Sequence, residues 1–586
     1  MSLRSFLCAI FTHAPMRPPT LAFLCLALAL LGLAAATFKL RLSPLPVGDE
    51  TTHVLMAQSL WEDGDLLFGQ LDLRRAYRTW NEGPAGLTVL TLDGGRTVRY
   101  AEPIAWALAA APAWALFGAA GLPMLNMALF LGMLSAAAGL FHDSNPLFLG
   151  GFFFASASFG YVFRGSPEVF LMACVFFALL LWRRAREQPD PLWSLLGAGA
   201  LLAAASLHQP ALALLGAALA ADLAFAGRAE RWKRAVLLLG AGALAFGLLG
   251  LVQWRMTGVW RPADPPEGVQ RRSFEADFPI ETPQDVWQGY GKDQGSPADG
   301  FRLLARNVGS FLVGRHTGLI PYFPFGVLAL ALLARDRSRG LLLAAMGAIV
   351  LLGLVLQPHR WHGGPEALGN ARLAVLYPAL LFLPGRLPAR WSLIPAYTAA
   401  GLWTAVAVAG AIVPPPPHTG EIPTFQALPL ELTLLGEGVQ LPGYAVRNWG
   451  QGLWIVPRAT FWVDEGQPDG VWVRGASTSE IVVISPKPLR QVRFRARSFA
   501  EENELVAASG AERVLVRFDS EGKRSGAPVT LALEPAASGL GFLPSGDRVY
   551  RFTLSVSDGI IPARRLPGNP DPRYLGVFLD FNGKEP

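Results

Sequence analysis

Apolar runs with almost no charged residues recur along the first 413 positions of the chain. An apolar helix of about 20 residues is long enough to cross the hydrocarbon core of a bilayer. The pattern therefore predicts eleven membrane-spanning helices. They are expected at residues 21–38, 122–141, 147–163, 167–182, 192–208, 210–226, 235–254, 318–334, 340–357, 371–385 and 391–413.

Short basic clusters separate several of these runs. If the N-terminus is cytoplasmic and the spans alternate, all four strong clusters fall on the cytoplasmic side, where Lys and Arg accumulate. The arrangement requires Pro103 to Gly118 to form an interfacial or re-entrant helix instead of a crossing. It places residues 39–121 and 255–317 in two large outer loops. The four clusters are Trp182–Arg186, Gly227–Arg234, Ala334–Arg339 and Gly385–Arg390.

The pattern changes after a proline-rich segment, residues 414–420, which predicts a stiff linker. Beyond it, short stretches alternate apolar and polar residues between Gly, Pro, Asp and Ser turns, as strands do. Residues 421–586 are therefore expected to form a β-sandwich outside the membrane. The predicted fold class is an eleven-span α-helical membrane domain, residues 1–413, followed by this sandwich. The clearest strand candidates are Val492–Phe499, Arg513–Phe518, Tyr550–Val556 and Arg573–Phe581.

Composition supports the membrane interpretation. The 586 residues are 52% hydrophobic and 16% charged, whereas soluble domains carry about 25% charged residues. The net charge of +6 comes from clusters between apolar runs, so it does not indicate nucleic-acid binding. Three cysteines, none of them beyond the linker, argue against a disulfide framework or a CxxC metal site. We expect an integral protein of the inner (plasma) membrane with an extracytoplasmic, periplasmic C-terminal domain.

An acidic pair, Asp49 and Glu50, opens the first outer loop and begins a short amphipathic helix. A carboxylate held at a membrane surface can take a proton from an incoming hydroxyl group. Asp49 is also a good helix N-cap, and Glu50 suits the positive end of the helix dipole. The pair alone does not choose between a catalytic and a capping role.

Other polar residues are expected at the same rim of the membrane. An arginine offers a phosphate a bidentate contact, although an arginine at a span end often extends to lipid headgroups instead. A tryptophan there can likewise be a belt residue, and no HxxxH or HExxH spacing indicates zinc. The candidates for substrate binding are Tyr100, Glu102, Arg164, Glu168, Arg315, Arg360, Trp361, His362 and Arg372.

Four landmarks occur in order along residues 20 to 413. They are Asp49–Glu50 followed by SLWEDGDL (Ser59–Leu66), the helix ending in Phe-Gly at Tyr100–Gly118, Arg164 with Glu168, and GGPEALGNAR (Gly363–Arg372) before LYPALLFL. In these features the chain resembles the GT-C membrane glycosyltransferases, such as protein O-mannosyltransferases and the lipid A aminoarabinose transferase. It departs from them in having Thr52–His53 after the acidic pair and one extra residue in the late motif.

The resemblance implies a hexosyl- or pentosyltransferase of cell-envelope glycan biosynthesis. It would invert the anomeric centre while moving a sugar from a polyprenyl-phosphate donor to a glycan, lipid or protein acceptor. Asp49 would be the base, and Glu50 would tune it or hold a metal. Arg372, with Arg360 or Arg315, would bind the phosphate. No cofactor is required, although a divalent cation could bind at Asp49 and Glu50.

Two other classes of function stay open. A transporter or flippase of lipid-linked glycans would normally carry ionisable residues in the middle of its spans, and the predicted spans lack them. A non-catalytic membrane anchor displaying a carbohydrate-binding β domain would also fit the domain order. The sequence identifies neither the sugar nor the acceptor.

Overall fold

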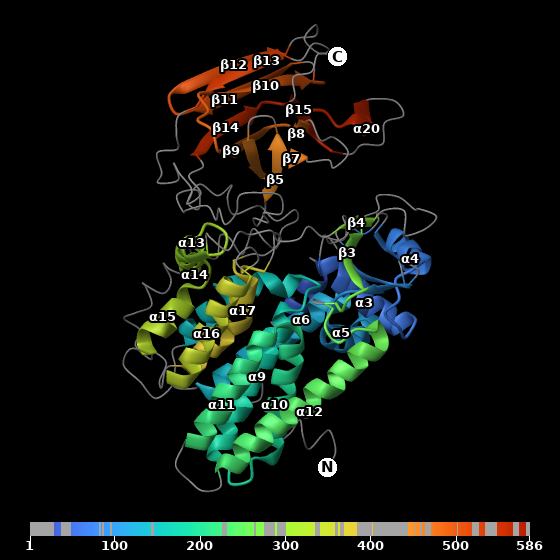
Figure 1. Ribbon diagram of the computed structural model, residues 1–586, viewed down its shortest axis with the longest axis vertical. Coiled ribbons are helices and arrows are strands. Elements are labelled where there is room, and N and C mark those ends of the chain that lie inside the picture. Colours follow the sequence, from blue (N-terminus) through green and yellow to red (C-terminus); the bar gives the residue numbers. More distant parts are fainter. Residues whose placement is uncertain are drawn as a thin grey trace. The chain divides into compact units, whose positions relative to one another are not determined.

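A computed structural model of the chain gives the fold (Figure 1). It divides into two compact units, each described by itself. The first unit is Met1–Tyr290, Gly318–Gly353 and Leu368–Pro416, and the second is Gly291–Thr317, Leu354–Ala367 and Pro417–Pro586. The structure describes residues 29–36, 49–80, 84, 87–93, 97–141, 146–225, 231–262, 265–274, 287–289, 300–333, 340–357, 361–363, 369–383, 401, 444–449, 452–457, 460–462, 470–500, 502–518, 527–533, 548–565 and 573–581.

The prediction of an eleven-span membrane protein is wrong. Among the described residues, two helical stretches, Ile104–Leu140 and Trp232–Thr257, are long and apolar enough to cross a membrane, by length and composition alone. Several other predicted spans form shorter helices, and the runs at 21–38 and 391–413 lie largely outside the described residues. The shorter apolar helices are Leu192–His208, Pro210–Phe225, Gly340–Leu356 and Ala371–Phe382.

Local backbone chemistry divides the apolar runs that looked continuous. The run at 147–163 breaks where Ser156 adopts an extended conformation, which separates α7 (Pro146–Phe154) from α8 (Ala157–Gly160). The run at 318–334 breaks before Pro324, the first residue of α15 (Pro324–Leu333). Proline has no N–H to continue a preceding helix. Apolar composition therefore overestimated the length of these helices.

The stretch from Ile104 to Leu140 is also interrupted. Helix α5 (Ile104–Phe117) ends at Gly118, whose φ of 60° is left-handed, and α6 (Gly121–Leu140) begins after one 3₁₀ turn. A Cβ on Gly121 would lie 2.1 Å from the carbonyl oxygen of Ala113. The two helices therefore pack closely at this glycine and do not form one straight rod. A helix at Pro103–Gly118 was predicted, and α5 supplies it.

The first unit also contains α3 (Asp49–Glu62), which packs against α5, and α12 (Arg231–Thr257), which packs against α10 and α11. Figure 1 shows α12 as a long helix that reaches the region of α3 and α5. The other elements are α4 (Gln70–Trp80), α9 (Glu168–Glu187), α10 (Leu192–His208), α11 (Ala213–Phe225), α14 (Leu319–Tyr322), α16 (Gly340–Leu356), α17 (Ala371–Leu376), β1 (Leu87–Leu92), β2 (Thr97–Tyr100), β3 (Gln270–Phe274) and β4 (Trp287–Gly289).

A small antiparallel sheet joins the two predicted outer loops. Its strand order is β2-β1-β3-β4, and Val89 of β1 lies opposite both Tyr100 of β2 and Arg272 of β3. Apolar residues of β1 and α5 pack against α3 in one buried cluster, which includes Val54, Leu87 and Trp106. Two segments about 180 positions apart in sequence therefore meet beside the acidic pair.

The C-terminal prediction of a sheet-rich domain is confirmed. In the second unit, a five-stranded antiparallel sheet, β13-β10-β15-β8-β7, and a six-stranded one, β12-β11-β14-β9-β6-β5, enclose an apolar core. The strands are β5 (Tyr444–Trp449), β6 (Gly452–Pro457), β7 (Phe461–Trp462), β8 (Gly470–Arg474), β9 (Ser477–Ser485), β10 (Gln491–Ser498), β11 (Asn503–Ser509), β12 (Glu512–Phe518), β13 (Ala527–Ala532), β14 (Arg548–Val556) and β15 (Leu575–Asp580). Among its described residues, this unit also contains helices α13 (Gly300–Val313) and α20 (Pro562–Arg565).

The core of this sandwich follows the predicted alternation. On β10, Val492, Phe494 and Ala496 point into the core, whereas Arg493 and Arg497 are exposed. Successive side chains of a strand point to opposite faces. The same alternation on β14 buries Tyr550, Phe552 and Leu554.

Candidate functional site

The carboxylate of Asp49 is exposed at the start of α3 and is held by the small sheet. The hydroxyl of Thr88, on β1, donates a hydrogen bond of 3.1 Å to Oδ1 of Asp49. Thr88 is itself fixed, because its backbone N–H donates to Oγ1 of Thr52 at 2.9 Å and its carbonyl accepts from Ala101 at 3.0 Å. The sheet therefore sets the direction of this carboxylate.

Glu50 is held from a different part of the unit. The backbone N–H of Gly165, in the turn before α9, donates to Oε1 of Glu50 at 2.7 Å. A Cβ on Gly165 would lie 2.5 Å from Cγ2 of Val54, so only glycine brings its amide this close to α3. The indole N–H of Trp106 donates to the carbonyl of Gly165 at 3.1 Å, and the turn is thereby fixed on α5.

An ion pair between Glu102 and Arg271 lies beside Asp49. Glu102 follows β2 and Arg271 belongs to β3, and both side chains are largely buried. Burial, with a smaller contribution from the charge of Asp49, raises the pKa of Glu102 to about 7, although Arg271 acts in the opposite direction. A carboxyl group with this pKa exchanges its proton near neutral pH, which suits proton transfer at an active site.

His53 is buried one helical turn after Asp49. Burial lowers its pKa to about 4, although the charges of Asp49 and Glu50 favour its protonated form. Its Nδ1 has no hydrogen-bond partner within the described part of the chain. The ring lies 6.1 Å from that of His208, measured between centroids. A neutral imidazole is therefore buried close to Asp49 and Glu50.

The first turn of α5 receives its hydrogen-bond acceptors from other helices. The N–H of Ile104 donates to Oε1 of Gln253, on α12, at 2.6 Å, and the N–H of Trp106 donates to Nε2 of His208, on α10, at 3.2 Å. Helix N-termini carry N–H groups without intrahelical acceptors, so these side chains replace a cap. The hydrogen bond from Ile104 to Gln253 also holds the C-terminal end of α12 close to Glu102.

Arg164 and Glu168 lie in the same region as Glu50. Their turn is held by Asn126, whose side-chain amide donates to the carbonyl of Arg164 at 2.8 Å. The guanidinium of Arg164 lies over the ring of Tyr161, 5.3 Å from its centroid. Burial raises the pKa of Glu168, and the nearby charge of Glu50 raises it further. The structure therefore brings together four sequence-predicted acidic residues, Asp49, Glu50, Glu102 and Glu168.

Tyr100 is placed differently. It is fully buried and its ring meets that of Phe68 edge to face, with centroids 5.6 Å apart. Its pKa is raised well above 10 by burial, and next by the charges of Asp72 and Asp63. Tyr100 therefore faces the acidic turn after α3 and belongs to the core under the sheet.

The later predicted residues are divided between the units. In the second unit, Arg315 is 2% exposed and forms an ion pair with Glu480 of β9 at 3.1 Å, so its charge is engaged within that unit. Trp361 and His362 are buried there too, with the Trp361 ring 6.2 Å from that of Phe311. Arg372 belongs to α17 of the first unit. Arg360 lies outside the described residues.

Sequence reasoning did not identify Thr88, Gly165 or Arg271 as part of the site. Thr88 and Arg271 reach it only because β1 pairs with β3, and no local motif indicates that pairing. For Gly165 the signal was present in the string RGSPE, where a glycine precedes the proline at the start of α9. No group of three or more His, Cys, Asp or Glu residues suited to a metal ion occurs among the described residues.

The geometry defines a cluster of four carboxylates with two arginines, Arg164 and Arg271, close to the end of an apolar helix. No protein-family model, curated protein or solved structure matches this chain.

Proposed function

We propose that this chain is a glycosyltransferase that moves a sugar from a lipid-phosphate donor to an acceptor hydroxyl group. The proposal rests on the accessibility and the orientation of the Asp49 carboxylate. This carboxylate is exposed, is oriented by the hydroxyl of Thr88, and lies close enough to Glu102 and Arg271 for its charge to act on their pair. An oriented and accessible carboxylate is what a general base requires.

The reaction would be a single displacement. The acceptor oxygen forms a bond to the anomeric carbon, the bond from that carbon to the phosphate oxygen breaks, and Asp49 takes the hydroxyl proton. The acceptor oxygen attacks from the face opposite the leaving phosphate, so the configuration at the anomeric carbon is inverted. The leaving lipid phosphate gains negative charge, and a fixed cation nearby would stabilise that charge in the transition state.

Arg271 is the described cation best placed for this task. Its partner Glu102 has a pKa of about 7, so near neutral pH the carboxylate is protonated for part of the time and attracts Arg271 less. An incoming phosphate could then share the guanidinium, which binds such groups in a bidentate way. Arg372 remains a further proposed phosphate ligand, because α17 belongs to the same unit.

A lipid-linked donor is favoured by the position of α12. Many of its side chains are apolar and exposed, among them Leu244, Leu248 and Leu251, and its end is fixed to α5 two residues after Glu102. A donor lipid lying along this helix would deliver its head group to the acidic cluster. We propose a membrane location on these grounds. The side assignment, with a cytoplasmic N-terminus and an outer C-terminal domain, stays a prediction.

The decisive experiment compares Asp49→Asn with Asp93→Asn in the full chain. Asp93 is an exposed carboxylate of the same sheet with a φ of 51°, a conformation that asparagine adopts readily. Membranes carrying each protein are supplied with polyprenyl-phosphate sugars, and release of polyprenyl phosphate is measured. We expect Asp49→Asn to abolish release and Asp93→Asn to retain it. Normal turnover by Asp49→Asn, or no release by the wild type with any sugar tested, overturns the proposal.

A further inference from the structure

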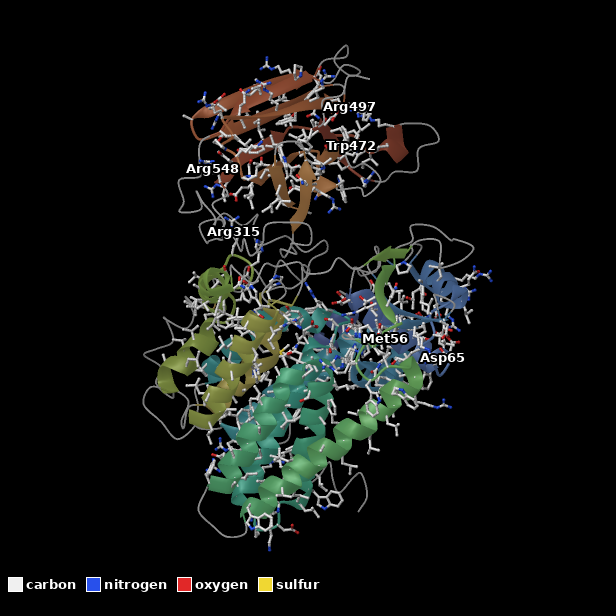
Figure 2. The ribbon with its side chains drawn as sticks, viewed as in Figure 1. Met56, Asp65, Arg315, Trp472, Arg497 and Arg548 are labelled. Carbon is white, nitrogen blue, oxygen red and sulfur yellow. The ribbon has the colours of Figure 1, made fainter. Side chains whose placement is uncertain are left out.

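The outer face of the five-stranded sheet carries aromatic rings that do not belong to the sandwich core. On β8, Val471 and Val473 point inward, and Trp472 between them belongs to a separate apolar cluster that also includes Phe578. Because neighbouring side chains of a strand lie on opposite faces, Trp472 and Phe578 lie on the outside of the sheet. Figure 2 shows Trp472 and Arg497 near each other in this domain.

Three of these aromatic side chains and one arginine form a row across the sheet. In register, Trp462 of β7 lies opposite Trp472 of β8, Trp472 lies opposite Phe578 of β15, and Phe578 lies opposite Arg497 of β10. Neighbouring strands are about 4.8 Å apart, so the row extends roughly 14 Å. It begins with three aromatic rings and ends in a cation.

The row ends in the exposed Arg497, and the exposed ring of Phe499 packs beside it. The guanidinium of Arg497 lies over the Phe578 ring at 4.6 Å from its centroid. Phe499 is 45% exposed, and its ring lies 5.3 Å from that of Trp472 at an angle of 32°. Trp472 and Phe578 are largely buried, at 8% and 6% exposure. They pack against the exposed ring of Phe499 and the exposed guanidinium of Arg497, respectively.

The same face is positively charged. Arg493, Arg495 and Arg497 alternate along β10, with about 6.8 Å between successive side chains on one face. Asp580 lies opposite Arg495 and offsets one of these charges. Arg493 and Arg497 are exposed, as is Arg474 on β8. Among the described residues of these strands, this face thus presents more cations than anions around an aromatic ring.

We infer that this face binds an anionic glycan, with the sugar ring packed on Phe499 and its carboxylate on Arg497. The apolar face of a pyranose suits an aromatic ring, and a carboxylate accepts paired hydrogen bonds from a guanidinium. Phe499, which packs on Trp472, and Arg497, which lies over Phe578, offer both within one site, and the arginines along β10 extend the contact to neighbouring acidic sugars. This inference does not depend on the proposed transferase activity.

The test uses the full chain in detergent and measures binding of oligogalacturonate by calorimetry. The variants are Phe499→Ala and Arg497→Gln, with Arg497→Lys to keep the charge without the planar group. Matched controls on the other sheet are Leu515→Ala, 50% exposed on β12, and Arg513→Gln, also exposed there.

We expect Phe499→Ala and Arg497→Gln each to weaken binding about tenfold or more, a loss of about 1.4 kcal/mol. Arg497→Lys should fall between them and the wild type, and both control variants should bind like the wild type. The inference is overturned if oligogalacturonate does not bind, or if the control variants lose as much affinity. It is also overturned if neutral maltoheptaose or single-stranded DNA binds equally well, since this would indicate nonspecific attraction.

Discussion

The backbone N–H of Gly165 donates a hydrogen bond of 2.7 Å to the side-chain carboxylate of Glu50, a residue 115 positions earlier in the chain. The bond connects the turn before α9 to the first turn of α3. It depends on a residue without a Cβ, because Val54 occupies the space that a side chain would need. Position 165 therefore controls how Glu50 is held.

Replacement of Gly165 by alanine is the first prediction. The new methyl group would force the turn away from α3 and lengthen the bond to Glu50. Overpacking of this kind costs about 1–3 kcal/mol of stability. We expect proposed transfer to fall at least tenfold while the protein still folds, as measured by release of polyprenyl phosphate and by thermal unfolding. Gly150→Ala, at a glycine of α7 with open space around it, is the control: it should leave transfer unchanged and should not lower stability, because alanine favours a helix by up to about 1 kcal/mol over glycine.

Thr88→Val removes the hydroxyl that orients Asp49 but keeps the size and branching of the side chain. The carboxylate would lose its only described hydrogen-bond donor and turn more freely. We expect kcat for transfer to fall about tenfold with KM little changed, because the base is still present but less well placed. Thr88→Ser should restore most of the rate. Equal rates for the valine variant and the wild type would show that Asp49 is not positioned by Thr88.

Glu102→Gln should change how stability depends on pH. Burial raises the pKa of Glu102 from 4.5 to about 7 in the folded protein, so between these values the folded state holds more protons than the unfolded state. Glu102 therefore makes its full contribution to the free energy of unfolding below about pH 4.5, and this contribution is lost as the pH rises to 7. The lowered pKa of His53 acts in the opposite direction but is common to both proteins.

The measurement for Glu102 is chemical unfolding of wild type and variant from pH 5 to pH 8. The unfolding free energy of Glu102→Gln minus that of the wild type should increase by about 1.4 kcal/mol for each pH unit up to pH 7. Above pH 7 this difference should become constant. A difference that does not vary with pH would mean that Glu102 titrates normally.

Arg315→Met tests the ion pair inside the second unit. Arg315 is almost fully buried against Glu480, which also lies 3.6 Å from Arg551. Removing one partner of a buried pair typically costs about 3–5 kcal/mol, and Arg551 should reduce that to roughly 2–3 kcal/mol. Arg517→Met breaks an exposed pair with Glu504 and should cost less than about 1 kcal/mol. Protease resistance of the β-sandwich on heating distinguishes the two variants.

The β-sandwich was predictable because its signal is local. Strands such as Arg548–Val556 alternate apolar and polar residues, and the burial of each follows directly. The helical region was predicted less well because apolar runs do not show where a helix ends. Ser156 and Pro324 each interrupt a predicted run through the backbone, and these effects depend on local conformation more than on hydropathy.

The candidate site was partly predictable for the same reason. Asp49, Glu50 and Glu102 could be found because they adjoin apolar segments in sequence. Thr88 and Arg271 could not, since they arrive through the pairing of β1 with β3. Arg315 suggested a phosphate ligand from its position beside an apolar run, but its charge is engaged by Glu480, 165 residues later in the chain.

The ladder between β1 and β3 has a consequence for biosynthesis. Leu87 pairs with Phe274, so the sheet that holds Asp49 cannot close until the ribosome has passed residue 274. Contacts of such long sequence separation form slowly because a large loop must close first. The nascent chain would therefore carry an unassembled acidic segment while α5 to α12 are made, and the site would gain its geometry only late in translation.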